Sequence, residues 1–282
     1  MISIIIRAKN EMPWLKYTLR MLKLQDRQDF ELVCVDSGSQ DGSWETLQMH
    51  KTNVCYQILP EEYIPGKVLN QAISRSRGDI IVFNNADCIP LQRNWLSELV
   101  KPLESDKKVA AVFARQIPRP DAHPLVQKDY ERAFGDGQIA AGWRHFFSLA
   151  SSAVQRELIV KYPFDENIQY SEDIEWSWRM KQMGFYIQYV KDSIVWHSHN
   201  YNLAQIKKRY LGEGRAEKTI YQDYYQTHQE DLSFIRSVLF AAGMESFRDF
   251  AFLLRTNHLD WVFKAPVYRL AQRYFAWKGR TL

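Results

Sequence analysis

The first part of the chain alternates between short apolar runs and stretches whose leucines recur at helical spacing. Four runs rich in β-branched residues have the length of buried strands, namely residues 2–6, 31–35, 80–83 and 109–113. Residues 13–24 follow the first run and carry a proline at the point where a helix would begin. Strands that alternate with helices predict an α/β fold with a mainly parallel sheet, covered by helices on both faces.

The rhythm changes after about residue 114. Residues 115–150 are rich in proline and glycine, which predicts a long and partly irregular segment. Beyond it the chain shows one helical pattern, two short strand patterns and two amphipathic helical patterns: residues 171–183, 186–190, 193–196, 232–254 and 261–277. We therefore expect an α/β domain over residues 1–200 and a helical C-terminal extension over residues 201–282.

Polar side chains follow three of the predicted strands. The first strand continues into Arg7 and Glu11, the second into Asp36, and the strand at residues 80–83 into Asn85 and Asp87. Ligands of open α/β sheets bind at the carboxyl ends of the strands. Three polar strand ends in one sheet therefore predict a binding cleft there.

The two acidic strand ends each have a functional and a structural interpretation. A carboxylate at the position of Asp87 is able to hold a hard divalent cation that bridges diphosphate oxygens, although Asn and Asp also form turns. The run from Asp36 to Ser43 offers acidic, hydroxyl and glycine residues for a nucleobase and a ribose. Asp41 or Ser43 is equally suited to cap the helix that follows.

Two later motifs carry titratable groups. Glu172 and Asp173 begin a predicted helix, where acidic residues complement the helix dipole and where Asp173 is also a candidate general base. His197 and His199 follow a strand, and strand alternation would direct both imidazoles to one face. With Asp87 as a partner, such a histidine suits Mn²⁺ or Mg²⁺, whereas zinc would require further His or Cys ligands.

Composition narrows the class of protein. The chain carries 37 Lys and Arg against 33 Asp and Glu, and a net charge of +4 does not by itself indicate a nucleic-acid partner. The three cysteines form no metal or disulfide pattern. The N-terminus lacks the features of a signal peptide, and no apolar run approaches the roughly 18 residues that span a bilayer. We therefore expect a cytoplasmic protein.

With these motifs in order, the chain resembles the family 2 glycosyltransferases, which have the GT-A fold. The likeness covers residues 1 to about 215 and rests on residues 3–11, 35–43 and 77–87, on Ser171-Glu172-Asp173 and on His197-Ser198-His199. The segment from Trp196 to Tyr201 is also similar to some bacterial rhamnosyltransferases. A QxxRW motif and membrane spans, features of processive synthases, are not found in the sequence, so single transfer is expected.

The resemblance implies a role for each motif. Asp36 matches the aspartate that reads the nucleobase, with Arg7 and Glu11 beside it, and Asn85-Ala86-Asp87 matches the DxD motif, whose last aspartate binds the metal. Asp173 matches the catalytic base, with Glu172 assisting it. His197 is the expected additional metal ligand and His199 the reserve. Gly66 and Lys67 fall where a loop approaches the donor.

Two departures from the family pattern concern charge. Asn85 replaces the first DxD aspartate and removes one negative charge, and Ser37 replaces the second aspartate of the usual DDGS-like run. The implied reaction is an inverting, metal-dependent transfer of one sugar from a nucleoside diphosphate to a glycan or lipid-linked acceptor. UDP is the first candidate for the donor nucleotide, and dTDP and GDP are the others. A sugar-1-phosphate nucleotidyltransferase and a non-catalytic sugar-nucleotide or glycan-binding module are the alternatives.

The acceptor side is expected within residues 115–150, where the charged candidates are Arg115, Arg119, Asp121, His123 and Arg144. The helical extension contains a basic stretch that includes Lys207, Lys208, Arg209, Arg215 and Lys218. Such a stretch suits peripheral contact with the anionic inner face of a membrane, and it equally suits a solvated helix face.

Overall fold

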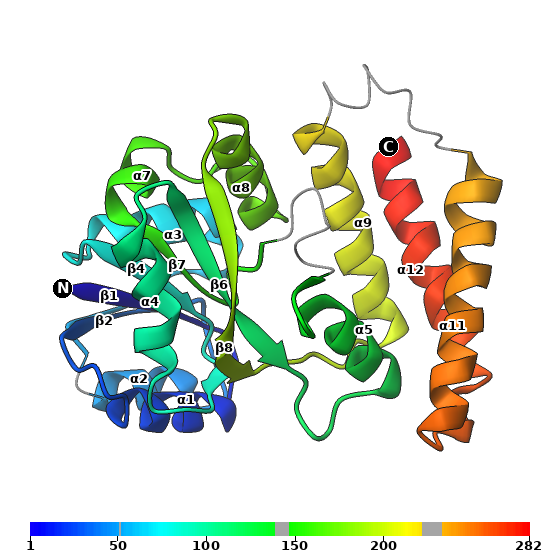
Figure 1. Cartoon of the computed structure of the whole chain (residues 1–282), viewed down its shortest axis with the longest axis horizontal. Coiled ribbons are helices and arrows are strands. Elements are labelled where there is room, and N and C mark those ends of the chain that lie inside the picture. The colour runs from blue at the N-terminus through cyan, green and yellow to red at the C-terminus, as the bar shows by residue number, and fades with distance from the viewer. Residues whose placement is uncertain (51, 139–146, 222–232) are drawn as a thin grey trace. The chain divides into compact units, whose positions relative to one another are not determined.

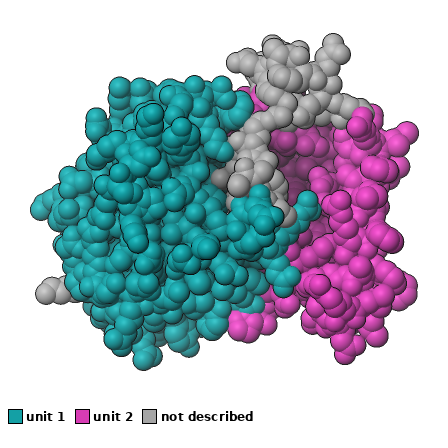
Figure 2. Space-filling model, in the orientation of Figure 1, with its two compact units in different colours: residues 1–119, 130–168, 172–198 teal, residues 120–129, 169–171, 199–282 magenta. Residues whose placement is uncertain are grey.

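The computed structural model describes residues 1–50, 52–138, 147–221 and 233–282, and its elements are drawn in Figure 1. The described residues form two compact units, which Figure 2 shows in different colours. The first unit contains residues 1–119, 130–168 and 172–198, and the second contains residues 120–129, 169–171 and 199–282. A domain boundary near residue 200 stays a prediction.

The first unit is built on an eight-stranded sheet with the order β3-β2-β1-β4-β7-β6-β8-β5. Its strands are β1 (Ile2–Ala8), β2 (Phe30–Asp36), β3 (Val54–Gln57), β4 (Ile80–Asn84), β5 (Ile89–Pro90), β6 (Val109–Ile117), β7 (Ser151–Gln155) and β8 (Tyr186–Trp196). The strands β3, β2, β1 and β4 are parallel to their neighbours, and so are β6 and β8, whereas β7 runs antiparallel to β4 and β6 and β5 runs antiparallel to β8.

Helices cover both faces of this sheet. One buried apolar cluster joins the sheet to α1 (Trp14–Lys23), α2 (Ser43–Met49) and α4 (Trp95–Ser105). The other joins the opposite face to α3 (Pro65–Ser74), α7 (Arg156–Lys161) and α8 (Glu172–Gln182). The expected mainly parallel α/β sheet with helices on both faces is confirmed.

The sheet differs from the sequence expectation in two places. Residues 186–196 form the single strand β8, where the sequence predicted two strands with a break after residue 190. A register shift between Ala114 and Arg115 of β6 accommodates the residues at that break. Strand β7 lies between β4 and β6 in the sheet, although Ser151 and Ser152 give it no strong apolar pattern. The segment at residues 115–150 is also less irregular than expected, because it contains the end of β6 and helix α5 (Pro124–Phe134).

The second unit is helical. Its long elements are α9 (Leu203–Ile220), the π-helical turn η2 (Ile235–Phe240), α11 (Ala241–Arg255) and α12 (Lys264–Thr281), with the short turn η3 (Leu259–Trp261) between the last two. A buried ionic group links α11 and α12 to residues 128 and 129 of α5: Arg269 bonds both Asp249 and Asp129, and Lys128 also contacts Asp249. None of the helices in the described ranges is long and apolar enough to span a bilayer.

Helices α9 and α12 approach closely at two glycines. A Cβ at Gly214 would overlap the carbonyl oxygen of Ala276, and one at Gly279 would overlap that of Leu211. Gly243 in α11 instead has open space around the corresponding position. The first two glycines are therefore required by packing, and the third is not.

We expect Gly214→Ala to destabilise the protein by about 1–3 kcal/mol, the usual cost of overpacking a tight contact. The matched change Gly243→Ala should be neutral or stabilising by up to about 1 kcal/mol, since alanine is the better helix former. Thermal unfolding of both variants measures this difference. Equal melting temperatures for the two variants would contradict the packing role of Gly214.

Candidate active site

The candidate site lies where β1, β4, β6 and β8 end in the first unit. The loop after β4 is tied to the end of β1, because the Ala86 N–H donates to the Arg7 carbonyl at 3.0 Å. Thr18 of α1 donates to the Ala86 carbonyl at 2.8 Å, and Asn84 donates to the Cys88 carbonyl at 2.8 Å. These bonds satisfy the loop's backbone and hold Asp87 at a defined position.

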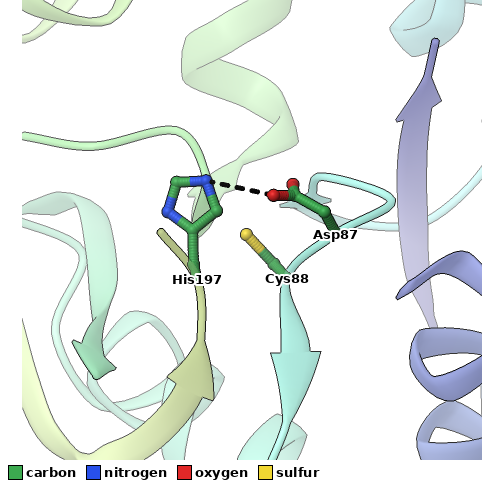
Figure 3. A group of neighbouring side chains, drawn as sticks. All are labelled: Asp87, Cys88 and His197. Carbon is green, nitrogen blue, oxygen red and sulfur yellow. Dashed lines mark ion pairs between the residues drawn. The ribbon is translucent and has the colours of Figure 1, made fainter. Parts of the chain in front are cut away.

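Asp87, Cys88 and His197 form a buried group whose potential ligand atoms all lie within 4.8 Å of one another (Figure 3). The imidazole Nε2 of His197 faces the Asp87 carboxylate, with 3.7 Å between Nε2 and Oδ2. Asp87 comes from the loop between β4 and β5, and His197 follows β8. The fold therefore brings together two residues that are 110 positions apart in the printed sequence.

The other ring nitrogen of His197 has its own partners. Nδ1 lies 2.7 Å from Gln116 Oε1 and 3.3 Å from the Tyr130 hydroxyl. The amide nitrogen of Gln116 donates to Ser148 at 2.8 Å, which orients the amide oxygen toward the histidine. Since an amide oxygen only accepts, the ring donates to Gln116 from Nδ1, and in the neutral form of the ring the Nε2 lone pair then faces Asp87.

A lone pair and a carboxylate oxygen that face each other suit a cation between them. Carboxylate and imidazole are ligands that Mn²⁺ accepts, and two protein ligands leave coordination positions for phosphate oxygens. The Gln116 contact resembles the outer partner that commonly orients a metal-binding histidine. The residues present therefore fit a divalent ion, although the Cys88 thiol is a softer ligand than such an ion prefers.

Arg119 places a positive charge against Asp87. Its guanidinium donates to Asp87 Oδ2 at 3.1 Å and to the Ser198 carbonyl, and it stacks over the Trp14 ring with 4.5 Å between Cζ and the ring centroid. The backbone N–H of Arg119 also donates to the Ser198 hydroxyl. Sequence reasoning placed Arg119 among the unranked acceptor-side candidates, whereas the structure places it directly against Asp87.

The carboxylates here outnumber this arginine. Burial, and then the Asp87 carboxylate, raise the pKa of Glu11, and Arg119 offsets only part of the effect. Asp41 adds a further negative charge in the same neighbourhood. A site that raises the pKa of a carboxyl group to about 8 resists further negative charge and therefore favours binding of a cation.

A second group gathers around Arg7, whose guanidinium links three elements. It donates to Asn85 at 3.3 Å, to Glu172 at 3.2 Å and to the Tyr63 hydroxyl at 3.4 Å. Asn85 and Glu172 both belong to motifs that the sequence singled out. The ion pair with Glu172 is largely buried, so Arg7 is held rigidly between β1, the loop after β4 and helix α8.

Asp173 lies beside this group at the start of α8. Its carboxylate accepts the Leu149 N–H at 3.3 Å and the Ile174 N–H at 2.9 Å. Burial, followed by the Glu172 carboxylate, raises the pKa of Asp173 to about 7, against the lowering effect of these bonds and of Arg7. A carboxylate with a pKa near neutrality is suited to accept a proton.

Asp36 is engaged by its own loop. Its carboxylate accepts the backbone N–H groups of Gly38 and Ser39, the Ser39 hydroxyl and the Gln57 side chain. Asp41 accepts the N–H groups of Met12 and Ser43, which ties the loop after β1 to the start of α2. These bonds show that the run from Asp36 to Ser43 stabilises its own loop and the start of α2. Its role in binding a nucleotide stays a prediction.

The remaining candidates lie elsewhere. Gly66 and Lys67 are in the first turn of α3 rather than in a loop, with Gly66 against the backbone of Asp165 and Lys67 exposed. His199 belongs to the second unit, where its ring stacks on Tyr201. Because β8 ends at Trp196, strand alternation does not extend to the two histidines, and that part of the sequence argument was wrong.

The described acceptor-side candidates are divided between the two units. Arg115 is partly buried on β6, whereas Asp121 and His123 belong to the second unit, where the His123 ring contacts Trp261. Arg144 lies outside the described residues. Sequence reasoning missed Gln116 and Tyr130, which contact His197, and Trp14, which contacts Arg119, because these contacts depend on how distant strands and helices pack.

Comparison with known proteins identifies the family to which this α/β chain belongs. The model of the Glycosyl transferase family 2 matches residues 3–161. The chain belongs to this family and is a glycosyltransferase. Curated relatives include the O-antigen chain rhamnosyltransferase WbaN of Salmonella anatum, 30% identical over 227 residues, with 76% of this chain and 71% of WbaN covered. The O-antigen chain rhamnosyltransferase RfbN of Salmonella typhimurium is 26% identical over 84% of this chain and 79% of its own length.

Solved structures show the same fold. A mannosyltransferase of Pyrobaculum calidifontis, in complex with GDP-Man and Mn²⁺, superposes with a TM-score of 0.67 at 19% identity and covers 99% of this chain and 86% of its own. Glucosyl-3-phosphoglycerate synthase of Mycobacterium tuberculosis, in complex with Mn²⁺, UDP-Glc and phosphoglyceric acid, superposes with a TM-score of 0.56 at 20% identity. That match covers 79% of each chain. The expected GT-A fold is confirmed.

Proposed function

We propose that this glycosyltransferase transfers one sugar from a nucleoside diphosphate to a hydroxyl of a glycan or lipid-linked acceptor, with inversion and with a divalent metal. The observation that carries the proposal is the opposition of the Asp87 carboxylate and the His197 Nε2, with the proton of the imidazole held at Nδ1 by Gln116. Such a pair of ligands could hold the cation through which a transferase binds the diphosphate of its donor.

Donor binding is assigned to the ends of β1, β2 and β4. Asp87 and His197 would hold Mn²⁺ or Mg²⁺, which supplies positive charge at the oxygens of the departing diphosphate. Arg7 and Asn85 form a hydrogen-bonding edge beside them, and we retain Glu11, Asp36, Gly66 and Lys67 as further donor-side candidates. UDP is the first candidate nucleotide, and GDP and dTDP are the others, since one neighbouring structure contains GDP-Man and another UDP-Glc.

The proton of the acceptor hydroxyl is assigned to Asp173. Its raised pKa makes it a stronger base than an ordinary aspartate, and the N–H groups of Leu149 and Ile174 orient its oxygens. A single base and a single displacement at the anomeric carbon invert its configuration. Glu172 assists indirectly, because its charge raises the pKa of Asp173 while its bond to Arg7 keeps α8 in place.

The rhamnosyltransferase relatives suggest a deoxyhexose or hexose donor and an acceptor of the O-antigen type. A nucleotidyltransferase would use a phosphate-binding loop after the first strand, where this chain has Arg7-Ala8-Lys9-Asn10-Glu11. A non-catalytic binding module would have no use for a base of raised pKa beside the donor residues. Both alternatives are therefore weaker than sugar transfer.

The metal assignment is tested by direct binding. We expect His197→Ala to weaken Mn²⁺ binding by at least about tenfold, because even the loss of outer partners of a metal ligand costs that much. The matched variant His199→Ala should bind Mn²⁺ within about twofold of the wild type. Electron paramagnetic resonance of free Mn²⁺ during a titration measures both. If Mn²⁺ binding weakened in His199→Ala and not in His197→Ala, His199 would be the metal ligand instead.

The base assignment predicts a loss of turnover without a loss of donor affinity. Asp173→Asn should lower kcat by about 10²–10⁴-fold, the usual contribution of a general base, while nucleotide-sugar binding stays near the wild-type value. Glu175→Gln is the matched control, since Glu175 lies on the same helix and pairs with Arg179. Full activity in Asp173→Asn would rule out Asp173 as the base.

The pH dependence follows from the same carboxylate. Below its pKa of about 7, Asp173 is protonated and cannot accept a proton, so kcat should fall as the solution becomes acidic. Glu172→Gln removes the neighbouring negative charge and should move the midpoint of this decline to lower pH. Initial rates measured across neutrality test both statements. A midpoint that is the same in wild type and Glu172→Gln would contradict the role given to Glu172.

A further inference from the structure

One helix of the second unit exposes an unusual number of large apolar side chains. Seven of them lie between residues 235 and 254 and form what we name the apolar stripe: Ile235, Leu239, Phe240, Met244, Phe247, Phe250 and Leu254. Phe240 is 65% exposed, Phe247 72% and Ile235 71%. Single exposed apolar residues are ordinary on protein surfaces, whereas a contiguous set marks an interaction site.

The stripe occupies one side of the helix formed by η2 and α11. Val238, Ala242, Asp249 and Leu253 are buried, and their spacing places them on the opposite side. From Phe240, the last residue of the π-helical turn, Met244 and Phe247 follow at intervals of four and three residues. The wider π turn brings Ile235 and Leu239 into line with them, because it shifts the phase of the helix.

The orientation of this helix is fixed by charge as well as by packing. Asp249 is fully buried and bonded to Arg269 and Lys128. Rotation of the helix about its axis would break these bonds and leave buried charges without their partners, at a large energetic cost. The apolar stripe therefore cannot turn inward while the unit keeps its core.

Charge along the same helix selects the partner. Arg236, Arg248 and Arg255 are exposed, and Arg236 and Arg248 lie one turn from Phe240 and Met244. Within residues 233–255 the acidic residues are Glu245, which pairs with Arg273, and the buried Asp249. The exposed charge of this segment is thus entirely positive.

A second copy of the chain is a poor occupant for this surface. A two-fold contact places the same patch on both partners, so the arginines of one copy would approach those of the other. An anionic bilayer satisfies both features, because its interior accepts the apolar side chains and its headgroups attract the arginines. We propose that the apolar stripe docks in the plane of an anionic phospholipid bilayer.

This assignment differs from the contact that the sequence suggested. The basic residues of α9 are exposed, but the large apolar side chain exposed on that helix is Leu203 alone. Arg209 of α9 also pairs with Glu213 and stacks on Tyr201. Membrane docking through the stripe does not require turnover, so the inference goes beyond the proposed function and fails or succeeds independently of it.

Vesicle flotation of the full chain tests the proposal. Wild type should bind vesicles of phosphatidylcholine mixed with phosphatidylglycerol and should bind pure phosphatidylcholine vesicles more weakly, and salt should reduce the difference. Phe240→Ser/Phe247→Ser should lower the partition coefficient by about tenfold or more, because the variant lacks the two aromatic rings that enter the bilayer in the wild type. Arg236→Gln/Arg248→Gln should remove the preference for phosphatidylglycerol.

Two controls separate this surface from others. Met49→Gln/Val160→Gln removes exposed apolar groups of the first unit and should leave binding unchanged. Lys207→Gln/Lys208→Gln removes charge from α9 and should change binding far less than the phenylalanine pair. Circular dichroism confirms that the variants are folded. The proposal would be overturned if the wild type failed to float or if the phenylalanine variant floated as the wild type does. It would also be overturned if the wild type were a dimer and the phenylalanine variant a monomer.

Discussion

The neutralisation of one buried carboxylate organises the candidate site. Asp87 is 2% exposed, and an ionised group at that depth requires compensating charge or hydrogen bonds. The compensating charge comes from Arg119 beyond β6, while His197 beyond β8 faces the same carboxylate and Glu11 beyond β1 adds a second acidic group. The ends of β1, β4, β6 and β8, four strands that run in the same direction, must therefore meet at one place, and the sheet order β1-β4-β7-β6-β8 brings them there.

Two aspartates in this region have opposite environments. Asp87 is paired with the Arg119 guanidinium and faces the His197 imidazole, an arrangement that suits a carboxylate that binds a cation. Asp173 has its pKa raised by burial and by Glu172, which suits a group that gains and loses a proton near neutrality. Carboxyl groups in different surroundings are a common basis for divided roles in catalysis. Arg7 separates the two functions, since it binds Asn85 on one side and Glu172 on the other.

Much of the sheet and part of the site could be predicted from the sequence. The strands β1, β2, β4 and β6 have continuous apolar runs because they are buried on both faces, and their polar ends stand out for the same reason. Strand β7 escaped notice because its serines are buried through neighbours in the sheet rather than through an apolar pattern. The pairing of His197 with Gln116 could not be predicted, since it depends on the parallel register of β6 and β8. The apolar stripe was also hidden, because the π-helical turn shifts the phase that a regular helical pattern would show.

A thermal-shift panel of UDP-, dTDP- and GDP-sugars, with and without Mn²⁺, tests the central claim most directly. A ligand at about 100 times its Kd stabilises the folded state by roughly 2.7 kcal/mol, which is a readily measured rise in Tm. Our account predicts that sugars of one nucleotide raise the Tm, that Mn²⁺ is required for the rise, and that His197→Ala abolishes it. A rise of equal size in the presence of a chelator, or no rise with any nucleotide, would contradict a metal-dependent donor site at Asp87 and His197.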